Sequence, residues 1–213
     1  MDIAEAKSLL GMVSGVLYVV GFIPYAKAIW RDRHISSGTE GKTEPSKASW
    51  LIWITLDVIT LAGMIAKDSV NFMLIGCIAG GSLVMILALI YGKKGWDWLE
   101  KLCLIGAGLG IAMWAITGNP IIGMTISLSV TFLGSVPTLK NTWKDPGSED
   151  KLGWTLFFIS CCLALVAVKE WTFASAAQPI VFFTIEGMMM ILLYLVPMFK
   201  KPVAKEQAER EAA

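Results

Sequence analysis

The stretch Pro24-Tyr25-Ala26-Lys27-Ala28-Ile29-Trp30-Arg31-Asp32 returns as Pro137-Thr138-Leu139-Lys140-Asn141-Thr142-Trp143-Lys144-Asp145. Both copies end an apolar segment and carry Pro, Lys, Trp, a basic residue and Asp at the same spacing, 113 positions apart (137 − 24). A repeat of this kind indicates that two similar units build the fold.

The repeat extends beyond this stretch on both sides. Further matched pairs are Ser14 with Ser127, Gly21 with Gly134, Lys47 with Lys151, Trp50 with Trp154, Asn71 with Gln178, Gly80 with Gly187, Lys93 with Lys200, and Lys94 with Lys201. These pairs fall on three successive apolar segments of each copy, so each unit is predicted to contain three helices.

The composition is that of an integral membrane protein. The chain is 55% hydrophobic and 16% charged, and its mean hydropathy of +0.64 is too high for a soluble domain of 213 residues. A net charge of +1 without a long basic cluster gives no support for a nucleic-acid partner. The expected partners are membrane lipid and a small polar solute, and the pattern is compatible with a homo-oligomer.

Cysteine and histidine usage gives no support for a metal, a cofactor or a catalytic group. The four cysteines lie inside apolar segments, are interpreted as small hydrophobic residues, and lack the spacing of a metal site or a disulfide framework. His34 is the only histidine and lies in a charged loop. We therefore predict a protein that is not an enzyme, with no metal ligands and no catalytic residues.

Seven apolar segments are each about long enough to cross a hydrocarbon core of ~30 Å at ~1.5 Å per helical residue. They span 8–30, 49–67, 71–92, 98–117, 120–142, 153–169 and 177–199, and the sixth is the shortest. Because a unit of three helices reverses direction, a single linker helix lets both units share one orientation. The prediction is an all-α membrane protein with a three-helix unit at 1–95 (the first unit), a linker helix at 96–118, a three-helix unit at 119–201 (the second unit) and a tail at 202–213. The two units are expected to be parallel repeats related by an axis along the membrane normal.

Loop charges predict that the N-terminus is outside and the C-terminus cytoplasmic. This orientation leaves only Lys7, Lys67 and Lys169 outside. It places fifteen of the 18 basic residues inside: Lys27, Arg31, Arg33, Lys42, Lys47, Lys93, Lys94, Lys101, Lys140, Lys144, Lys151, Lys200, Lys201, Lys205 and Arg210. The expected location is a bacterial or archaeal inner membrane, crossed several times.

This arrangement resembles the PQ-loop and SWEET transporter superfamily over about residues 8–200. The resemblance rests on a three-helix unit with a proline near the end of its first helix, repeated in parallel around one linker. It implies a SWEET-like fold and transport by alternating access. The motif Pro45-Ser46-Lys47-Ala48-Ser49-Trp50-Leu51-Ile52-Trp53 is similar to one found in bacterial membrane proteins of that type.

The sequence departs from the superfamily at its signature positions. The glutamine that usually follows the proline is Tyr25 in one copy and Thr138 in the other. The substrate-binding asparagines of SWEET sugar transporters are replaced by Met73 and Ile180. The resemblance therefore does not imply a sugar as the solute.

Pro24 and Pro137 are predicted hinges. A proline inside a helix removes one backbone donor and crowds the preceding turn, so both should kink the first helix of their unit. The alternative is that each proline merely ends its helix, but Lys27 and Trp30 continue at helical spacing beyond Pro24. Three Gly-x-x-x-Gly pairs are interpreted as helix contacts: Gly11 with Gly15, Gly76 with Gly80, and Gly106 with Gly110.

Trp50, Trp53 and Asp57 lie on one face of the second segment. A stripe running from indole to carboxylate is typical of a polar cavity wall, although Trp50 and its match Trp154 can also be interface anchors. The candidate substrate-binding set is Trp50, Trp53, Asp57, Asn71, Trp154, Gln178 and Glu186.

Asp57 and Glu186 are the only acids well inside apolar segments, and both break the repeat. Their matched positions hold Cys161 and Ala79, so the duplicated scaffold does not account for either acid. We predict that both face the interior between the units and that at least one exchanges a proton during transport. The alternative is a buried acid that a neighbouring hydroxyl or backbone group satisfies.

Three functions are compatible with these features. A secondary transporter or facilitator of a small polar solute accounts for the repeats, the prolines and the buried acids. A carrier of the nicotinamide riboside type would use aromatic stacking on its ligand. A non-transporting receptor similar to the KDEL receptors would need a basic cluster in its cavity, whereas the buried charges here are acidic.

Overall fold

The computed structural model describes residues 2–37, 39, 42–43, 45–92, 95, 98–144, 146 and 149–199, without the side chains of Pro137 and Asn141. Lys93, Lys94, Asp145, Lys200, Lys201 and the tail at 202–213 lie outside the described residues. The described chain is helical, with no β-strand. The prediction of an all-α, multi-pass membrane protein is confirmed at this level.

Each of the seven predicted segments coincides with a helix. The helices are α1 Ile3–Asp32, α2 Lys47–Ile65, α3 Phe72–Tyr91, α4 Trp98–Thr117, α5 Pro120–Lys144, α6 Lys151–Ala167 and α7 Phe173–Met190, which continues as the π-helix η2 Ile191–Leu195 and as α8 Val196–Phe199. Six of them are long and apolar enough to span a membrane when α7, η2 and α8 are taken as one helix. The seventh, α6, is apolar and 17 residues long.

Local sequence sets where the helices begin. Side chains that accept a hydrogen bond from the first turn cap five of the helices: Asp2 for α1, Ser46 for α2, Asn71 for α3, Asp150 for α6 and Thr172 for α7. The turn between α4 and α5 uses Gly118, whose φ of +66° suits glycine, and Pro120 opens the next helix.

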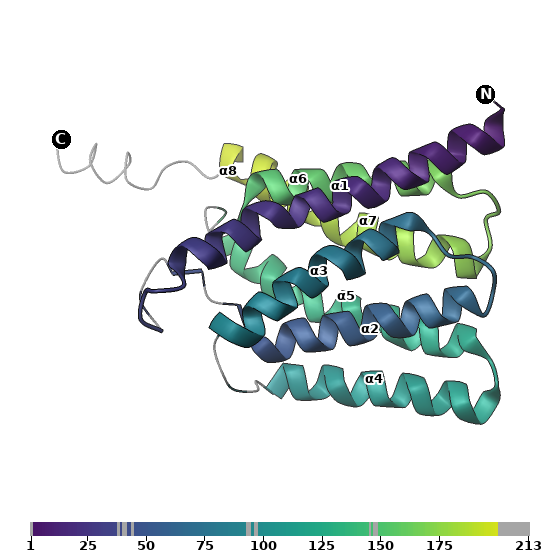
Figure 1. The fold of residues 1–213 in the computed structure, drawn as a ribbon, viewed down its shortest axis with the longest axis horizontal. Coiled ribbons are helices and arrows are strands. Elements are labelled where there is room, and N and C mark those ends of the chain that lie inside the picture. Colours follow the sequence, from purple (N-terminus) through teal and green to yellow (C-terminus); the bar gives the residue numbers. More distant parts are fainter. Residues whose placement is uncertain are drawn as a thin grey trace.

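The helices pack in the same order within each unit. In the first unit α3 lies between α1 and α2, and in the second α7 lies between α5 and α6. Between the units, α1 packs on α6 and α2 packs on α5. The linker α4 lies at one edge of the bundle, against α5 and α2 (Figure 1).

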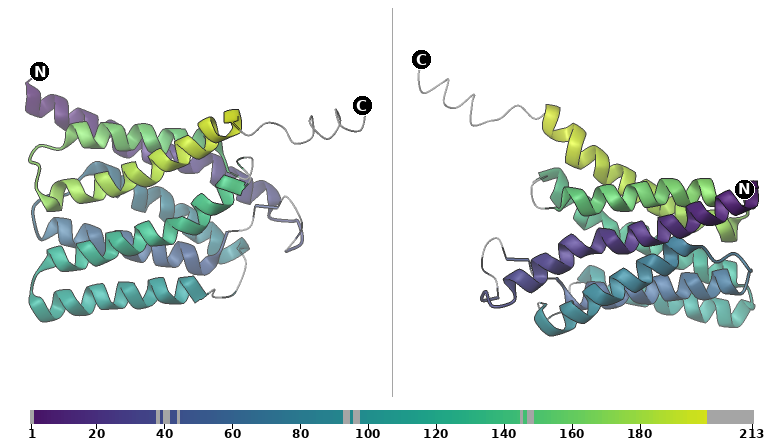
Figure 2. Two further views of the ribbon diagram at one scale, coloured as in Figure 1. Left: turned by 180° about the vertical axis from the view of Figure 1, so that it is seen from behind. Right: turned by 45° about the horizontal axis from the view of Figure 1, so that its top comes forward.

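The two ends of the bundle carry different connections. Figures 1 and 2 show the start of α1 at one end, beside the α2–α3, α4–α5 and α6–α7 connections, which we call the N-terminal end. The other end, called the C-terminal end, holds the last turns of α1, α3 and α5, the first turns of α2, α4 and α6, and α8. Cytoplasmic placement of the C-terminal end stays a prediction.

The core lies between the units, and the outer surface is apolar. Tyr18, Phe22, Met73 and Cys77 belong to one buried cluster contributed by α1, α2, α3, α5, α6 and α7. Large apolar side chains stay exposed around the periphery, and Ile116 on α4 is 79% exposed. An outer surface of this kind fits lipid better than water.

The Pro-Ser-x-x-Ser motif ties the linker to the first unit. Ser46 caps α2, and the hydroxyls of both Ser46 and Ser49 donate to Glu100 on α4. Pro45 precedes them, and its carbonyl lies so close to Gly92 that a Cβ there would approach within 2.3 Å. The motif therefore has a structural role at the junction of α2, α3 and α4.

Candidate functional site

Two carboxyl groups, Asp57 on α2 and Glu186 on α7, are buried within the bundle. Their exposed fractions are 6% and 4%. An acid at this depth is costly in a membrane protein and is a candidate for function by default. Both are residues that the repeat comparison singled out.

Glu186 is bound across the interface between the two units. The hydroxyl of Tyr18, on α1, donates a hydrogen bond to Glu186 Oε1 at 2.9 Å. The other carboxyl oxygen, Oε2, is buried and has no hydrogen-bond partner within the described part of the chain. Sequence reasoning missed Tyr18, since a tyrosine in an apolar helix looks like an ordinary core residue.

Asp57 is bound within the first unit. The thiol of Cys77, on α3, donates to Asp57 Oδ2 at 3.3 Å. The same thiol is within electrostatic range of Glu186 and of Cys161. The interpretation of the cysteines as purely hydrophobic residues is therefore wrong for Cys77, which lies near both carboxyl groups.

Each acid thus receives one hydrogen bond from a neighbouring side chain. Such hydrogen bonds are expected if the acids are structural and neighbouring groups satisfy them. For Asp57, the bond from Cys77 satisfies one carboxyl oxygen. The account is incomplete for Glu186, because an unpaired carboxyl oxygen in the interior costs free energy without any visible compensation.

Asn71 and Gln178 form a second polar contact between the units. Asn71 Nδ2 donates to Gln178 Oε1 at 2.9 Å, and Asn71 Oδ1 caps α3 by accepting from Leu74. Gln178 is fully buried, and its Nε2 has no hydrogen-bond partner in the described structure. The contact lies toward the N-terminal end, closer to it than Glu186, which follows Gln178 by eight positions along α7 (186 − 178).

Serine side chains form further polar contacts across the interface. Ser14 Oγ on α1 bonds to the carbonyl and hydroxyl of Ser160 on α6, and the Ser160 hydroxyl bonds back to the Ser14 carbonyl. Ser127 Oγ on α5 donates to the carbonyl of Leu56 on α2 at 2.7 Å. The match of Ser14 with Ser127 was the sequence signal for these contacts.

Aromatic rings surround the Tyr18 end of the site. The Tyr18 ring lies 4.6 Å from Phe157 and 6.1 Å from Phe182, measured between centroids. Phe22 lies 4.7 Å from Phe157 and 5.9 Å from Trp50, toward the C-terminal end. We call these five residues the aromatic cluster.

The tryptophans of the predicted set lie in different surroundings. Trp50 is 9% exposed, within the aromatic cluster, and this burial differs from that of an interface anchor. Trp53 is half-buried, with its ring 5.3 Å from that of Trp50. Trp154 is near Phe157 and donates through Nε1 to Glu149 at 3.0 Å. Burial raises the pKa of Glu149, the Trp154 hydrogen bond opposes the rise and Asp150 adds to it.

The prolines lie inside helices. Helix α1 continues through Pro24 to Asp32, so Pro24 does not end it. Helix α5 likewise continues past position 137 to Lys144, while the side chain of Pro137 lies outside the described residues. A hinge role for both stays a prediction.

The site offers acids and aromatic rings without basic groups. Among the described residues the one salt bridge joins Arg31 and Asp32, at the C-terminal end. No described Lys, Arg or His interacts with Asp57 or Glu186. No group of three or more metal-ligating side chains occurs in the ranges that the structure covers.

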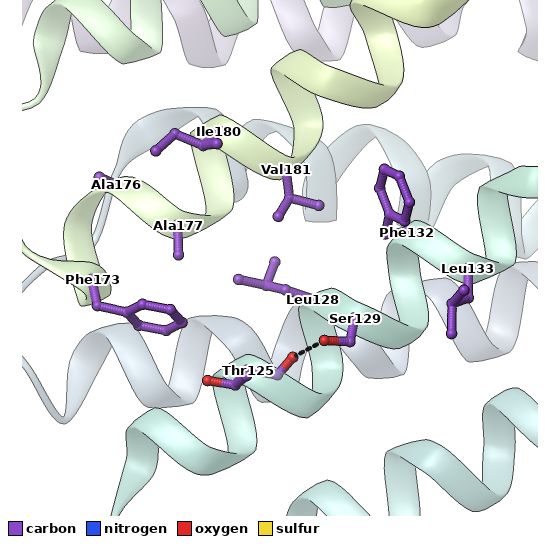
Figure 3. A pocket seen from close by; sticks show the side chains of 10 residues that line it. All are labelled: Thr125, Leu128, Ser129, Phe132, Leu133, Phe173, Ala176, Ala177, Ile180 and Val181. Carbon is purple, nitrogen blue, oxygen red and sulfur yellow. Dashed lines mark hydrogen bonds between the residues drawn. The ribbon is translucent and has the colours of Figure 1, made fainter.

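Two grooves lie away from these residues. The larger, of about 630 Å³, runs between α5 and α7 (Figure 3). Thr125 and Ser129 line it, but their hydroxyls bond to backbone carbonyls of α5, which leaves the walls mostly apolar. The smaller groove, of about 340 Å³, lies between α5 and the α7–η2 segment.

No protein-family model matches the sequence, and no curated protein matches it.

Proposed function

We propose that the protein is a secondary transporter of a small polar solute, working by alternating access between the first and second units. The helix packing supports two units related by a pseudo-two-fold axis. An axis that relates α1, α2 and α3 to α5, α6 and α7 converts the α1–α6 contact into the α5–α2 contact, and both contacts are present. Alternating access by rocking of two repeats needs such an interface.

The observation that carries this proposal is the pair of matched hydrogen bonds between the units. Ser14 and Ser127 are matched in the repeat, and so are the residues that accept from them, Ser160 and Leu56. Asn71 and Gln178 are matched to each other, so their hydrogen bond lies where such an axis would pass. The same contacts made twice favour an ancient duplication with a working interface between its halves.

In this conformation contacts join the two units on both sides of the buried acids. The Asn71–Gln178 hydrogen bond lies on the N-terminal side, and the aromatic cluster extends toward the C-terminal side. Glu186 and Asp57 lie between them, where a solute would be held after both sides had closed. Pro24 and Pro137 would supply the bending that opens one side at a time.

The two buried acids favour proton coupling over passive transport. A carboxyl group that is dry in one state and reaches water in another gains and loses a proton as the units rock. Asp57 and Glu186 belong to different units, so their separation changes with that motion.

The aromatic cluster favours the nicotinamide riboside type of carrier as a second candidate. Flat aromatic solutes stack on rings such as Phe157, which packs against Tyr18, the residue that binds Glu186, and Trp50 belongs to the same cluster of rings. Uptake of nicotinamide riboside itself would select this candidate among the possible solutes.

Cross-linking tests the rocking motion. The variant N71C/Q178C, in membrane vesicles, is treated with a short bifunctional thiol reagent, and uptake of a solute identified by thermal shift is measured. The panel contains sugars, amino acids, amines and nucleosides at two pH values. We expect the link between the units to stop uptake and its reductive cleavage to restore it.

A matched control keeps this test specific. The variant T155C/Y194C joins α6 to η2, the continuation of α7, within the second unit, where the two hydroxyls lie 2.9 Å apart. Alternating access predicts that this link leaves uptake intact. Uptake that survives the N71C/Q178C link would contradict the proposal.

Orientation is tested separately by labelling single cysteines with an impermeant thiol reagent in intact cells. We expect labelling at Asp68 and none at Lys42 or Ser148, of which Ser148 lies outside the described residues. The reverse pattern would invert the topology.

A further inference from the structure

We propose that the solute is a small organic cation, and that it binds at Asp57 and Glu186 by replacing protons there. This inference rests on the proposed function, whose interface provides the route to the two acids. It is carried by three features of the buried site: its uncompensated acids, its unpaired polar atoms and its aromatic surroundings.

The first feature is a shortage of positive charge. Asp57 and Glu186 come from different units, yet neither has a basic side chain within interaction range among the described residues. An ionised carboxylate buried without a counter-charge is strongly unfavourable. The site is therefore stable with protons on the acids or with a cation beside them.

The second feature is an unused acceptor. Glu186 Oε2 is buried without a hydrogen-bond partner, although Oε1 of the same carboxyl is held by Tyr18 at 2.9 Å. Because the hydrogen bond from Tyr18 holds Oε1 in place, it also sets the direction in which Oε2 points. An ammonium or amidinium group has only donors and would pair with this oxygen, whereas a sugar hydroxyl would leave the charge of the carboxylate uncompensated.

The third feature is the ring cluster beside the acids. Tyr18, which holds Glu186, is 4.6 Å from Phe157 and 6.1 Å from Phe182. Aromatic faces attract cations, and the attraction grows when water is removed. Acids and ring faces without a basic side chain favour an organic cation over a neutral solute or an anion.

Exchange follows from charge balance. When the cation enters and one carboxylic acid loses its proton, the total charge of the closed site is unchanged. The new ion pair forms between the ligand cation and the carboxylate, and the released proton leaves to water on the open side. Transport would then be an exchange of cation against proton, with the two moving in opposite directions.

The titratable groups that face the carboxyls are few. They are Tyr18 on α1, Asp57 on α2, Cys77 on α3, Cys161 on α6 and Glu186 on α7, with Cys162 next to Cys161. Burial favours the neutral form of all of them, so the thiols and the phenol, which are already neutral in water at pH 7, stay protonated, and the two carboxyls are the groups that give up a proton when a cation enters. A pH dependence of binding would therefore report on Asp57 and Glu186.

Isosteric pairs test the charge requirement. 3,3-Dimethylbutylammonium is compared with 3,3-dimethylbutan-1-ol, and 1-methylnicotinamide, a pyridinium cation, with nicotinamide, so that each cation has a neutral partner of similar shape. Thermal shift and calorimetry are measured on the purified full-length protein. We expect at least one cation to bind tenfold or more tightly than its neutral partner, and to release about one proton per molecule bound, read from calorimetry in two buffers of different ionisation enthalpy.

Variants locate the charge. Glu186→Gln and Asp57→Asn keep the side-chain shape and remove the titrating group, so at least one should abolish the proton release and weaken cation binding tenfold or more. Asp68→Asn, in an exposed turn, is the matched control and should change neither. The thermal unfolding of each unliganded variant shows whether it has folded, and Tyr18→Phe provides a milder second test by freeing Glu186 Oε1.

The outcomes separate this inference from the transport proposal. Neutral partners that bind as well as the cations, or a panel in which no cation binds, would overturn the cation site. Uptake of a neutral solute that the N71C/Q178C link stops would overturn it too, while supporting a transporter. Cation binding with proton release, together with uptake that continues in the cross-linked N71C/Q178C protein, would support the cation site and contradict alternating access.

Discussion

The first and second units share one helix order but differ in how tightly their first and third helices pack. In the first unit, α1 and α3 touch through Gly15 and Gly76, where a Cβ on Gly76 would lie 2.2 Å from the Gly15 carbonyl oxygen. The matched positions of the second unit hold Leu128, which lines the groove of about 630 Å³ between α5 and α7, and Phe183, whose ring stacks on Phe158 of α6. A duplicated scaffold has thus become one tightly packed half and one looser half.

The last helix adds to this difference. After Met190 the chain forms the π-helix Ile191–Leu195, whereas α3 stays α-helical through the matched region. Such segments in helices often accompany functional sites. Because Glu186 lies just before it, the looser half also carries the acid that reaches across to the first unit.

Among the substitutions that test this difference between the units, removal of Trp50 should have the largest effect on stability. Trp50→Ala empties a packed position between Phe22 and Trp53, and we expect it to lower the free energy of unfolding by about 4 kcal/mol. Its match, Trp154→Ala, should cost clearly less, because Trp154 is half-buried. Unfolding in detergent measures both, and equal losses would contradict the asymmetry.

Ligand binding should separate Trp50 from its neighbour. If Trp53 lines the solute site, Trp53→Ala should abolish the ligand-induced thermal shift while the unliganded protein stays folded. Trp50→Ala should act mainly through stability. If Trp53→Ala keeps the ligand-induced thermal shift, Trp53 contributes to packing and not to the solute site.

A methyl group at the tight helix contact should have the next largest effect. Gly76→Ala pushes α3 away from α1, and overpacking against a backbone atom is expected to cost about 3 kcal/mol. Gly108→Ala on the open face of α4 is the control, since a Cβ there meets nothing within 4 Å. The midpoints of thermal unfolding of the two variants are compared. A Gly76→Ala protein as stable as the control would contradict tight packing between α1 and α3.

Conservative replacement of the acids should change function more than stability. We expect Asp57→Asn and Glu186→Gln to fold, and at least one to lose the pH dependence of solute uptake, because each removes a titrating group and keeps the shape. Uptake in vesicles across a pH series is the measurement. Wild-type profiles in both would assign the acids a structural role and favour a passive facilitator.

The matched serines should give the smallest effect and the sharpest test of the repeat. Ser14→Ala and Ser127→Ala each remove a hydroxyl that bonds to the opposite unit, at a cost of about 1 kcal/mol. Similar losses are expected if both contacts serve the same interface. Ser14→Ala is expected to be the more costly by a small margin, since it also leaves the Ser160 hydroxyl with one partner fewer. A loss at one serine and none at the other would contradict equivalent roles.

The sequence by itself determined the class of the protein and the course of its helices. Apolar runs, capping residues such as Asn71 and Thr172, and the turn at Gly118 act over a few positions, so they can be interpreted without knowing the fold. The break in the repeat also singled out Asp57 and Glu186, because a departure from a duplicated pattern is visible in the letters alone.

Only the tertiary structure decided which helix faces meet. Tyr18 and Glu186 are 168 positions apart. Helical periodicity predicts the helix face on which each residue lies, but not which helix packs against that face. Cys77 likewise looked like a small core residue until packing placed its thiol against Asp57. The tight α1–α3 contact and the loose α5–α7 contact depend on the volumes of the side chains that face each other on two helices. Which side chains face each other is known only once the helices are packed.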